Sequence, residues 1–597
     1  MSGGAADLAV AGLGTGAVAA LSGLGVLATY RVTGVLNVAF GAVGMLGAYL
    51  LRALVRDAHL PVYAAGLVVV LCAAPLLGLL LDAAVFGPLS VRAADAARTL
   101  TAGFGVTVLL VGIATAVWGE QARTDAPSLL PGSTLRIGGP GGPGGLGGLD
   151  VPTAVPIELA LVLLVALGLT WFSHGGPAIR AVIDDRRLAE LAGLPARRLA
   201  RVGWVAGTML AMLTGMLLAP QLRFDPPTLT LVIFETLGVA VAARLRSAPL
   251  AILFAFGTAI GQAELTGVHL AGAAGSVLDA VRSNLFVVLL LLATWLTPAF
   301  TAPTAARRGT RAGRLLPPYV LLLVFALFAW NLRAVDLHAA LAIPALALVL
   351  LSFRVLHSAG MLSLGQAGLA GIGALAAGWA ASGWGILAAP AAGAVVAAVL
   401  ALPVLRQAGL HLAVATLAAA TALSSFLFDQ PLFTPSAVQR PSFAQSDRAF
   451  LYLELVLTVL TLAALTFLDR GPAALRLTAL RDSEIAARTA GIAVDRARLA
   501  VFAAAGAVAA LGGALWAAGD QVIDPTAFEP AQGLIWFAAA AAVGFADSTA
   551  LIVAAIVLVI ADSYVAGASA ILVGAATLVL PRVSWEGVKL RALGLEL

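Results

Sequence analysis

The chain has 597 residues, of which 61% are hydrophobic and only 11% are charged, and its formal net charge is +5. Soluble globular proteins carry about 25% charged residues, so this composition excludes a protein whose whole surface faces water. Most of the surface must face lipid, and the sequence predicts an integral membrane protein that lies almost wholly within the bilayer.

Apolar runs that could cross a bilayer recur along the chain. A membrane-spanning helix needs about 20 apolar residues, and roughly 17 to 19 segments approach that length. In chain order the clearest of them are 9–30, 36–51, 61–82, 99–118, 153–173, 200–221, 281–300, 316–333, 337–355, 384–405, 408–428, 449–468, 499–518 and a pair within 549–580. Because the sequence shows no alternating strand pattern, we expect an all-α polytopic membrane protein with about 8–10 spans in each half.

Several kinds of site have no signal in the sequence. Cys72 is the only cysteine, which excludes an internal disulfide and a cysteine metal cluster. A P-loop needs a lysine followed by Ser or Thr, whereas Lys589 is followed by Leu590. Zinc-protease and serine-hydrolase motifs are missing too, so we expect no catalytic residue, metal site or bound cofactor. The first apolar run has no basic region ahead of it, so we expect no cleavable signal peptide.

Arginine supplies almost all of the positive charge, and it is concentrated between apolar runs. Clusters lie at 180–201, 307–314 and 470–498. Short loops rich in basic residues stay in the cytoplasm, so all three clusters are predicted to be cytoplasmic. The Gly/Pro segment at 140–143, the polar loop at 429–448 and the N-terminus are then expected outside, and the C-terminus inside.

The stretch 301–316 is short and basic, and it is predicted to be a cytoplasmic linker between halves 1–300 and 317–597. The halves repeat two segments in the same order. Residues 36–48 align with 362–374. In the other segment, at a constant offset, Ala181 matches Ala479, Asp184 matches Asp482, Ala189 matches Ala487, Gly193 matches Gly491 and Arg198 matches Arg496. Two related halves in parallel order predict a pseudo-twofold axis along the membrane normal, with a path between the halves.

Each of the two repeated basic loops is expected to place a short helix of mixed charge between two spans. Ala189 and Gly193 are four residues apart, as are Ala487 and Gly491, so each pair is expected on one helix face, where small side chains let a partner pack closely. An acid at the start of the helix suits its dipole, and the glycine can end it. The pattern favours a docking element; an ordinary charged loop is the alternative.

These loops resemble the cytoplasmic coupling loop of ABC importer permeases. The segment TYRVTGVLNVAFGAVGMLGAYL resembles one subunit type of the branched-chain amino acid permease family, and HSAGMLSLGQAGLAGIGALAA resembles the other. The resemblance covers most of the chain and implies a natural fusion of the two permease subunits. It implies an ATP-driven importer in the plasma membrane of a prokaryote, with two ABC ATPase subunits on the coupling loops and a solute-binding protein outside. ATP would bind to the partner subunits, and nucleic acid is not an expected partner.

The resemblance leaves the solute open between branched-chain amino acids and a related small polar solute. The family usually has a histidine where this chain has Phe40, and another where it has Gln366. The candidate residues of the translocation path are Asn37, Gly41, Ser363 and Gln366. The alternative role for the polar ones is hydrogen bonding between helices.

Two other classes of function are open at this point. An ion-coupled secondary transporter with parallel repeats needs ionisable groups within the membrane, and the apolar runs contain few; the main ones are Glu235, Glu264, His411 and Glu454. A membrane-embedded enzyme or a scaffold is the third class, and the missing catalytic motifs count against the enzyme.

Overall fold

The computed structural model describes residues 2–91, 96–119, 121–130, 132–137, 149–174, 181–182, 186–222, 224–243, 247–268, 272–296, 317–380, 383–404, 410–428, 437–565 and 567–579. It divides into two compact units, Met1–Leu296 and Thr297–Leu597. The predicted linker at 301–316 and the Gly/Pro segment at 140–143 lie outside the described residues.

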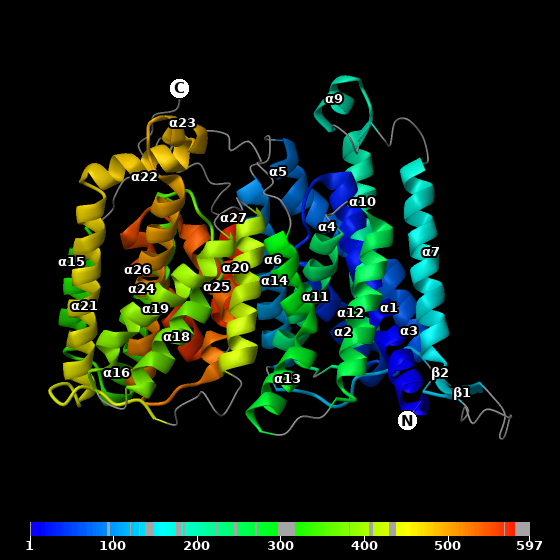
Figure 1. Cartoon of the computed structure of the whole chain (residues 1–597), viewed down its shortest axis with the longest axis horizontal. Helices are drawn as coiled ribbons and strands as arrows, with labels where there is room; N and C mark the ends of the chain where they lie inside the picture. Colours follow the sequence, from blue (N-terminus) through cyan, green and yellow to red (C-terminus); the bar gives the residue numbers. More distant parts are fainter. Residues whose placement is uncertain are drawn as a thin grey trace. The chain divides into compact units, whose positions relative to one another are not determined.

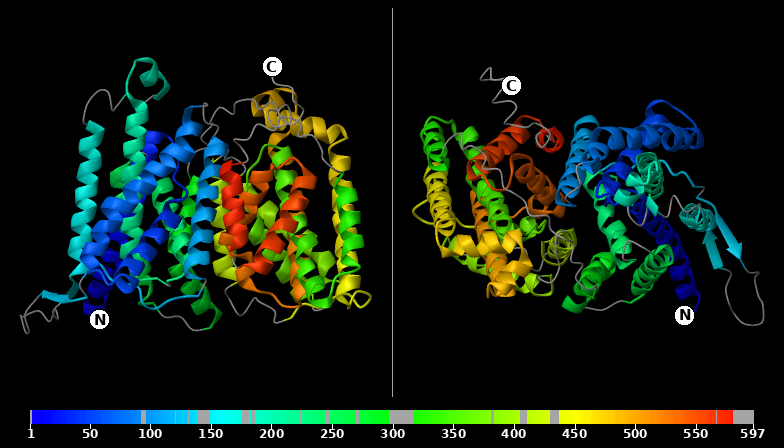
Figure 2. Two further views of the ribbon diagram at one scale, coloured as in Figure 1. Left: turned by 180° about the vertical axis from the view of Figure 1, so that it is seen from behind. Right: turned by 90° about the horizontal axis from the view of Figure 1, so that it is seen from above.

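The first unit is a bundle of helices with one small hairpin (Figure 1). Its α-helices are α1 (Ser2–Thr33), α2 (Phe40–Arg52), α3 (Val62–Val68), α4 (Ala74–Leu80), α5 (Gly87–Val91), α6 (Ala96–Trp118), α7 (Ala154–His174), α9 (Arg186–Leu191), α10 (Ala196–Leu218), α11 (Pro226–Ala242), α12 (Ala248–Leu265), α13 (Ala273–Ser283) and α14 (Leu285–Leu296). The π-helical turns η1 (Ala53–Asp57), η2 (Val69–Ala73) and η3 (Leu81–Phe86) continue neighbouring helices. Strands β1 (Thr134–Ile137) and β2 (Leu149–Pro152) pair antiparallel, with Thr134 opposite Pro152. Figure 2 shows this hairpin projecting from the helices near the N-terminal end of α1.

The described part of the second unit contains helices and no strand. Its helices are α15 (Pro318–Ala329), α16 (Ala334–Ala340), α17 (Ala342–Ser358), α18 (Gln366–Trp379), α19 (Gly385–Val404), α20 (Leu410–Leu423), α21 (Asp447–Leu468), α22 (Pro472–Asp482), α23 (Glu484–Thr489), α24 (Val494–Asp520), α25 (Pro530–Val543), α26 (Ser548–Tyr564) and α27 (Ala568–Val579). The π-helical turn η4 (Ser424–Phe428) extends α20, and the 3-10 turn η5 (Pro525–Phe528) precedes α25. The all-α polytopic fold that the sequence predicts is therefore confirmed.

The number of full-length spans is smaller than the sequence suggests. The described residues contain 10 helices that are long and apolar enough to cross a membrane, or 11 if the bent pair α13–α14 is one span, whereas roughly 17 to 19 were expected. The other apolar runs form shorter helices or breaks. The run 36–51 is interrupted because the chain unwinds before α2, and the helical axis turns by 73° between α13 and α14. Hydropathy averaged over a window does not detect such breaks.

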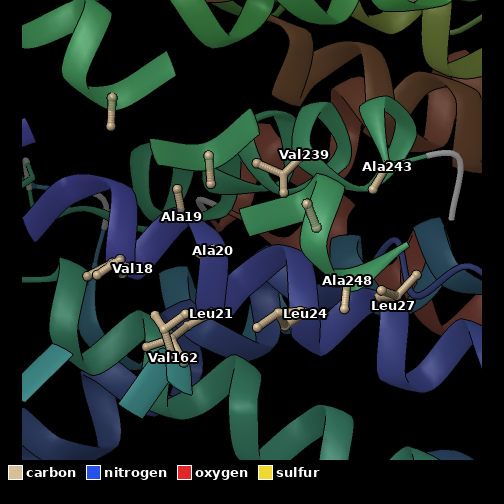
Figure 3. Packing of buried hydrophobic residues seen from close by; sticks show 14 of the residues in the cluster. Val18, Ala19, Ala20, Leu21, Leu24, Leu27, Val162, Val239, Ala243 and Ala248 are labelled. Atoms are coloured by element: carbon tan, nitrogen blue, oxygen red, sulfur yellow. The ribbon is translucent and has the colours of Figure 1, made fainter. Parts of the chain in front are cut away.

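The core of the first unit is built around α1. Small and branched side chains of α1 pack against α7, α11 and α12, and leucines such as Leu76 and Leu164 point outward, 60% and 67% exposed. Membrane helices associate through close packing of this kind because lipid tails are as apolar as the side chains, so the hydrophobic effect does not drive the helices together. Figure 3 shows the contact among Val18, Leu21, Leu24, Leu27, Val162, Val239, Ala243 and Ala248.

The two units repeat one backbone-to-backbone contact. In the first unit α10 meets α2 so closely that a Cβ at Gly215 would lie 2.0 Å from the carbonyl oxygen of Gly44. In the second unit α24 meets α18 in the same way, and a Cβ at Gly513 would lie 1.9 Å from the carbonyl oxygen of Ala370. These residues correspond under the two alignments found in the sequence, so the chain consists of two repeated halves.

Candidate functional site

The two repeated basic loops have the same backbone geometry. α9 and α23 contain 6 residues each. Gly193 follows α9 with φ +79°, and Gly491 follows α23 with φ +80°. Only glycine adopts this left-handed conformation without strain. A chain reversal of this type ends a helix by returning two amide groups to its last carbonyls.

The hydrogen bonds that close the two turns also correspond. The amide of Gly193 donates to the carbonyl of Glu190 (3.0 Å), and the amide of Gly491 donates to that of Arg488 (3.1 Å). One residue later, Leu194 donates to the carbonyl of Ala189 (2.9 Å) and Ile492 to that of Ala487 (3.0 Å). Each glycine therefore lies beyond its short helix. The expectation that it shares a helix face with the preceding alanine is wrong, because the glycine reverses the chain.

The alanines of the loops point inward. Ala189 and Ala487 are 3% and 0% exposed. Ala189 packs with Val182 and Ala196, and Ala181 lies against this cluster. These small residues hold the short helix against the next one and do not form an open docking face.

The apolar side chains that are exposed on the loops do not belong to these alanines. They belong to larger residues that the sequence analysis did not single out. Leu188 and Leu191 on α9 are 63% and 79% exposed, and Ile485 on α23 is 77% exposed. Their signal was a large aliphatic residue one or two positions from the buried alanine, and so on a different side of the short helix.

The charged residues of the loops occupy several environments. Arg198 and Arg496 are exposed near the start of α10 and α24, Asp482 is exposed at the end of α22, and Ala479 is half-buried one turn earlier. Asp184 lies outside the described residues. Oε2 of Glu484 accepts from Arg498 (2.8 Å) and Oε1 from Arg488 (3.0 Å). Glu484 therefore ties α23 to the start of α24.

A helix break lies at the start of each repeated early segment. Gly34 and Gly360 have φ +69° and +72°, and the chain is unwound from there to the start of α2 and of α18. Asn37 lies in the first break, fully buried, and neither side-chain Nδ2 nor Oδ1 has a partner among the described residues.

The second break presents a different set of polar groups. The Ser363 hydroxyl accepts from the Gly365 amide (3.1 Å), and Oε1 of Gln366 accepts from the Ser352 hydroxyl (3.0 Å). Nε2 of Gln366 is buried without a partner in the part of the chain that the structure describes. The two breaks are therefore alike in backbone and different in chemistry.

A small cavity lies beside each break. Gly41 lines the first together with Phe40 and Gly215, and Ser363 lines the second together with Thr416 and Phe502. Asn37 and Gln366 are buried and lie close in sequence to residues that line these cavities. Neither of them lines a cavity itself. Of the four path candidates, the structure thus brings two to a cavity wall.

Two of the ionisable candidates, Glu454 and Glu235, have buried carboxylate oxygens. Glu454 of α21 is 0% exposed, and neither carboxylate oxygen has a hydrogen-bond partner among the residues described. Oε1 of Glu235 in α11 is in the same situation. Glu264 is partly exposed near the end of α12, and the side chain of His411 lies outside the described set.

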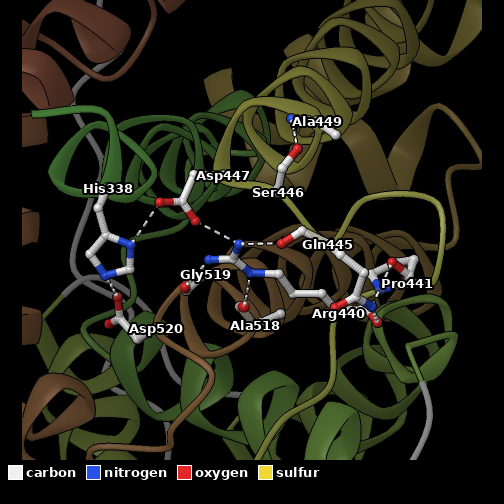
Figure 4. A network of polar contacts seen from close by, with 10 residues as sticks. All are labelled: His338, Arg440, Pro441, Gln445, Ser446, Asp447, Ala449, Ala518, Gly519 and Asp520. Atoms are coloured by element: carbon white, nitrogen blue, oxygen red, sulfur yellow. Dashed lines mark hydrogen bonds and ion pairs between the residues drawn. The ribbon is translucent and has the colours of Figure 1, made fainter. Parts of the chain in front are cut away.

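A polar network that the sequence did not reveal lies at the end of the second unit away from α22 and α23 (Figures 1 and 4). The Arg440 side chain is 4% exposed and donates to the carbonyl of Ala518 (3.0 Å) and to Oδ1 of Asp447 (2.6 Å). Nδ1 of His338 lies 3.4 Å from Oδ2 of Asp447, and Nε2 lies 4.0 Å from Oδ1 of Asp520. Arg440 therefore joins the end of α24 to the start of α21.

Comparison with known proteins agrees with this repeated architecture. The family of the branched-chain amino acid transport system permease component matches the chain twice, over residues 8–295 and 337–583. A comparison with curated proteins finds no match. The two family matches fall on the two repeated halves and confirm the resemblance read from the sequence. The chain belongs to the branched-chain amino acid transport permease family and is a fusion of two permease units.

Proposed function

We propose that this permease is the membrane component of an ATP-driven ABC importer in the plasma membrane of a prokaryote. The observation that carries the proposal is the equal geometry of the two loops around α9 and α23. Two such loops give one chain two docking points, which suits two ATPase subunits. ATP would bind to those subunits, and a solute-binding protein would deliver the solute from outside.

The exposed apolar side chains support docking at these loops. Leu188, Leu191 and Ile485 offer apolar surface on short helices, and such helices bind partners by placing that surface in a groove. The buried alanines keep each short helix against the helix that follows, and the ion pair between Glu484 and Arg498 adds a second link for α23. A displacement of α9 or α23 by the ATPase would therefore move α10 or α24.

The close helix contacts indicate where this movement acts. α10 meets α2 at Gly44, and both helices line the first cavity. α24 meets α18 at Ala370 and contributes Phe502 to the second cavity. Displacing α10 or α24 would change the shape of a cavity beside a helix break. A switch between two packings of this kind is sufficient for alternating access.

The proposed path includes Asn37, Gly41, Ser363 and Gln366, and the proposed solute is a branched-chain type amino acid or a related small polar solute. Among the described residues, Nδ2 and Oδ1 of Asn37 and Nε2 of Gln366 are the side-chain amide atoms without a partner at the breaks. Such groups bind neutral or zwitterionic polar groups by hydrogen bonding and carry no charge of their own.

Affinity purification from native membranes, followed by uptake in proteoliposomes, tests the proposal. We expect ABC ATPase subunits to co-purify and uptake to stop when ATP is withheld. Recovery of no ATPase, with uptake that continues without ATP, would contradict it.

Glu235 and Glu454 favour one rival function, an ion-coupled transporter, because buried ionisable groups often carry coupling ions. An ionophore added at constant ATP distinguishes the two. Collapse of uptake supports ion coupling, and unchanged uptake supports the ATP-driven importer.

A further inference from the structure

α22 joins the long span α21 to the short helix α23. α21 is a candidate span that ends at Leu468, and α22 begins a few residues later. Figure 1 shows α22 lying across the end of α21. A helix that crosses the end of a span in this way lies at the surface where the chain leaves the bilayer.

Three arginines of this segment lack an acidic partner in the described part of the chain. Arg470 and Arg476 are exposed and Arg481 is half-buried, and none of them pairs with a carboxylate among the described residues. The neighbouring Asp469 is already bound to Arg354. By contrast, Arg488 and Arg498 on the following elements both pair with Glu484. From Arg470 to Asp482 the segment holds three arginines and one carboxylate, so it keeps a net positive charge.

Large apolar side chains are exposed beside these arginines. Phe467 at the end of α21 is 78% exposed, and Leu475 on α22 is 77% exposed. Aliphatic or aromatic groups next to arginines are typical of helices that lie in the membrane interface, where the apolar groups enter the acyl region and the guanidinium groups stay among the headgroups.

We propose that Arg470, Arg476 and Arg481 form a binding site for anionic phospholipid headgroups, with Phe467 and Leu475 inserted among the acyl chains. The guanidinium fork matches the oxygen geometry of a phosphate. The charge complementarity is with the anionic leaflet surface, which attracts basic segments next to a span. Bound lipid holds α22 against the membrane and so sets the position of α23.

The effect of bound lipid on the position of α23 rests on the proposed function, because that position matters for transport only if an ATPase subunit docks on α23. The headgroup site itself does not depend on it. The test therefore uses the whole chain alone, without ATPase subunits, so that failure of the importer proposal and failure of the lipid site give different results.

A fluorophore on α22 reports the lipid contact. Cys72 is replaced by serine, and Leu475→Cys carries an environment-sensitive label. The protein is placed in vesicles of phosphatidylcholine with brominated acyl chains, with and without phosphatidylglycerol. We expect bromine to quench the label, and phosphatidylglycerol to increase the quenching. One arginine near an anionic surface changes the partition of a segment by about fivefold, so the triple variant Arg470→Gln, Arg476→Gln, Arg481→Gln should lose this increase.

Arg333→Gln is the matched control, because this exposed arginine precedes α16 at the other end of the second unit. It should leave the increase intact. Equal quenching in both vesicle types, or an increase that survives in the triple variant, would overturn the site. Displacement of the label from lipid by inorganic phosphate would assign the arginines to free phosphate instead. A label that is unquenched in all vesicles, and shielded only when ATPase is added, would assign α22 to a protein partner.

Discussion

Gly215 of α10 rests on Gly44 of α2 with no side chain between the two backbones, and a Cβ at Gly215 would lie 2.0 Å from the Gly44 carbonyl oxygen. The neighbour is backbone, so it cannot rotate away. The contact therefore tolerates glycine and nothing larger unless the two helices separate.

Gly215→Ala should destabilise the first unit. Forcing one carbon into a closed contact costs about 1–3 kcal/mol of the free energy of unfolding. Gly257→Ala is the control, because Gly257 also lies within a helix but no described atom is within 4 Å of its Cβ position. Alanine there should stabilise the helix by about 0.5–1 kcal/mol. Thermal unfolding in detergent measures both, and a similar effect of the two variants would contradict the close contact.

Substitutions at Gly491 should separate folding from coupling. Its φ of +80° makes an ordinary side chain cost about 1–2 kcal/mol, which the membrane fold can absorb, while the reversal after α23 is distorted. For Gly491→Arg, and for Gly193→Arg in the other loop, we expect normal insertion, continued ATP hydrolysis by the ATPase subunits and loss of uptake.

Gly491→Asn is the matched comparison, because asparagine adopts the left-handed conformation more readily than other residues. It should retain most of the uptake in proteoliposomes. Transport that is unchanged in both arginine variants would argue against a docking role for these loops.

Arg440→Met should destabilise the second unit strongly. The buried guanidinium satisfies Asp447 and the carbonyl of Ala518, and removing one partner of a buried ion pair costs about 3–5 kcal/mol. Arg448→Met removes a nearby exposed arginine whose guanidinium lies 5.9 Å from the ring centre of Trp330, and it should cost much less. The difference in melting temperature between the variants is the measurement, and equal values would show that the network contributes little.

The ion pair between Arg52 and Asp125 should give the first unit an acid-sensitive contact. The hydrogen bond from Arg52 (2.7 Å) holds the pKa of Asp125 below its ordinary value of 3.8. A lowered pKa in the folded state means that the pair stabilises the fold above the ordinary carboxyl range and is lost as the pH falls through the lowered value. The stability difference between wild type and Asp125→Asn should be constant near neutral pH and shrink below pH 3.8. A difference that instead changes around pH 6 would point to another group.

The features that could be predicted from the sequence are those with a local cause. Gly193 and Gly491 end their helices because glycine accepts the left-handed turn, and the positions are visible as a repeat at constant spacing. The match between the early segments is visible for the same reason, since each follows a glycine, Gly34 or Gly360, that breaks a helix.

The features that escaped prediction depend on partners distant in the sequence. Arg440 looks like an ordinary loop arginine until the carbonyls of Ala518 and Gly519 are brought beside it. Ala189 and Ala487 were expected to face a partner, but whether a small residue faces in or out depends on the helix that follows. The number of full-length spans was overestimated because breaks such as the unwound residues 36–39 before α2, or the 73° turn between α13 and α14, leave the average hydropathy unchanged.

The contact between Gly513 and Ala370, like that between Gly215 and Gly44, is made by main-chain atoms. Interlocked side chains must change rotamer before two helices can shift, whereas smooth backbone surfaces need no such step. In each half, a shift of one helix along the other at this contact therefore requires no change of rotamer. The side chains at the two breaks differ between the halves, while the main-chain contact is kept in both.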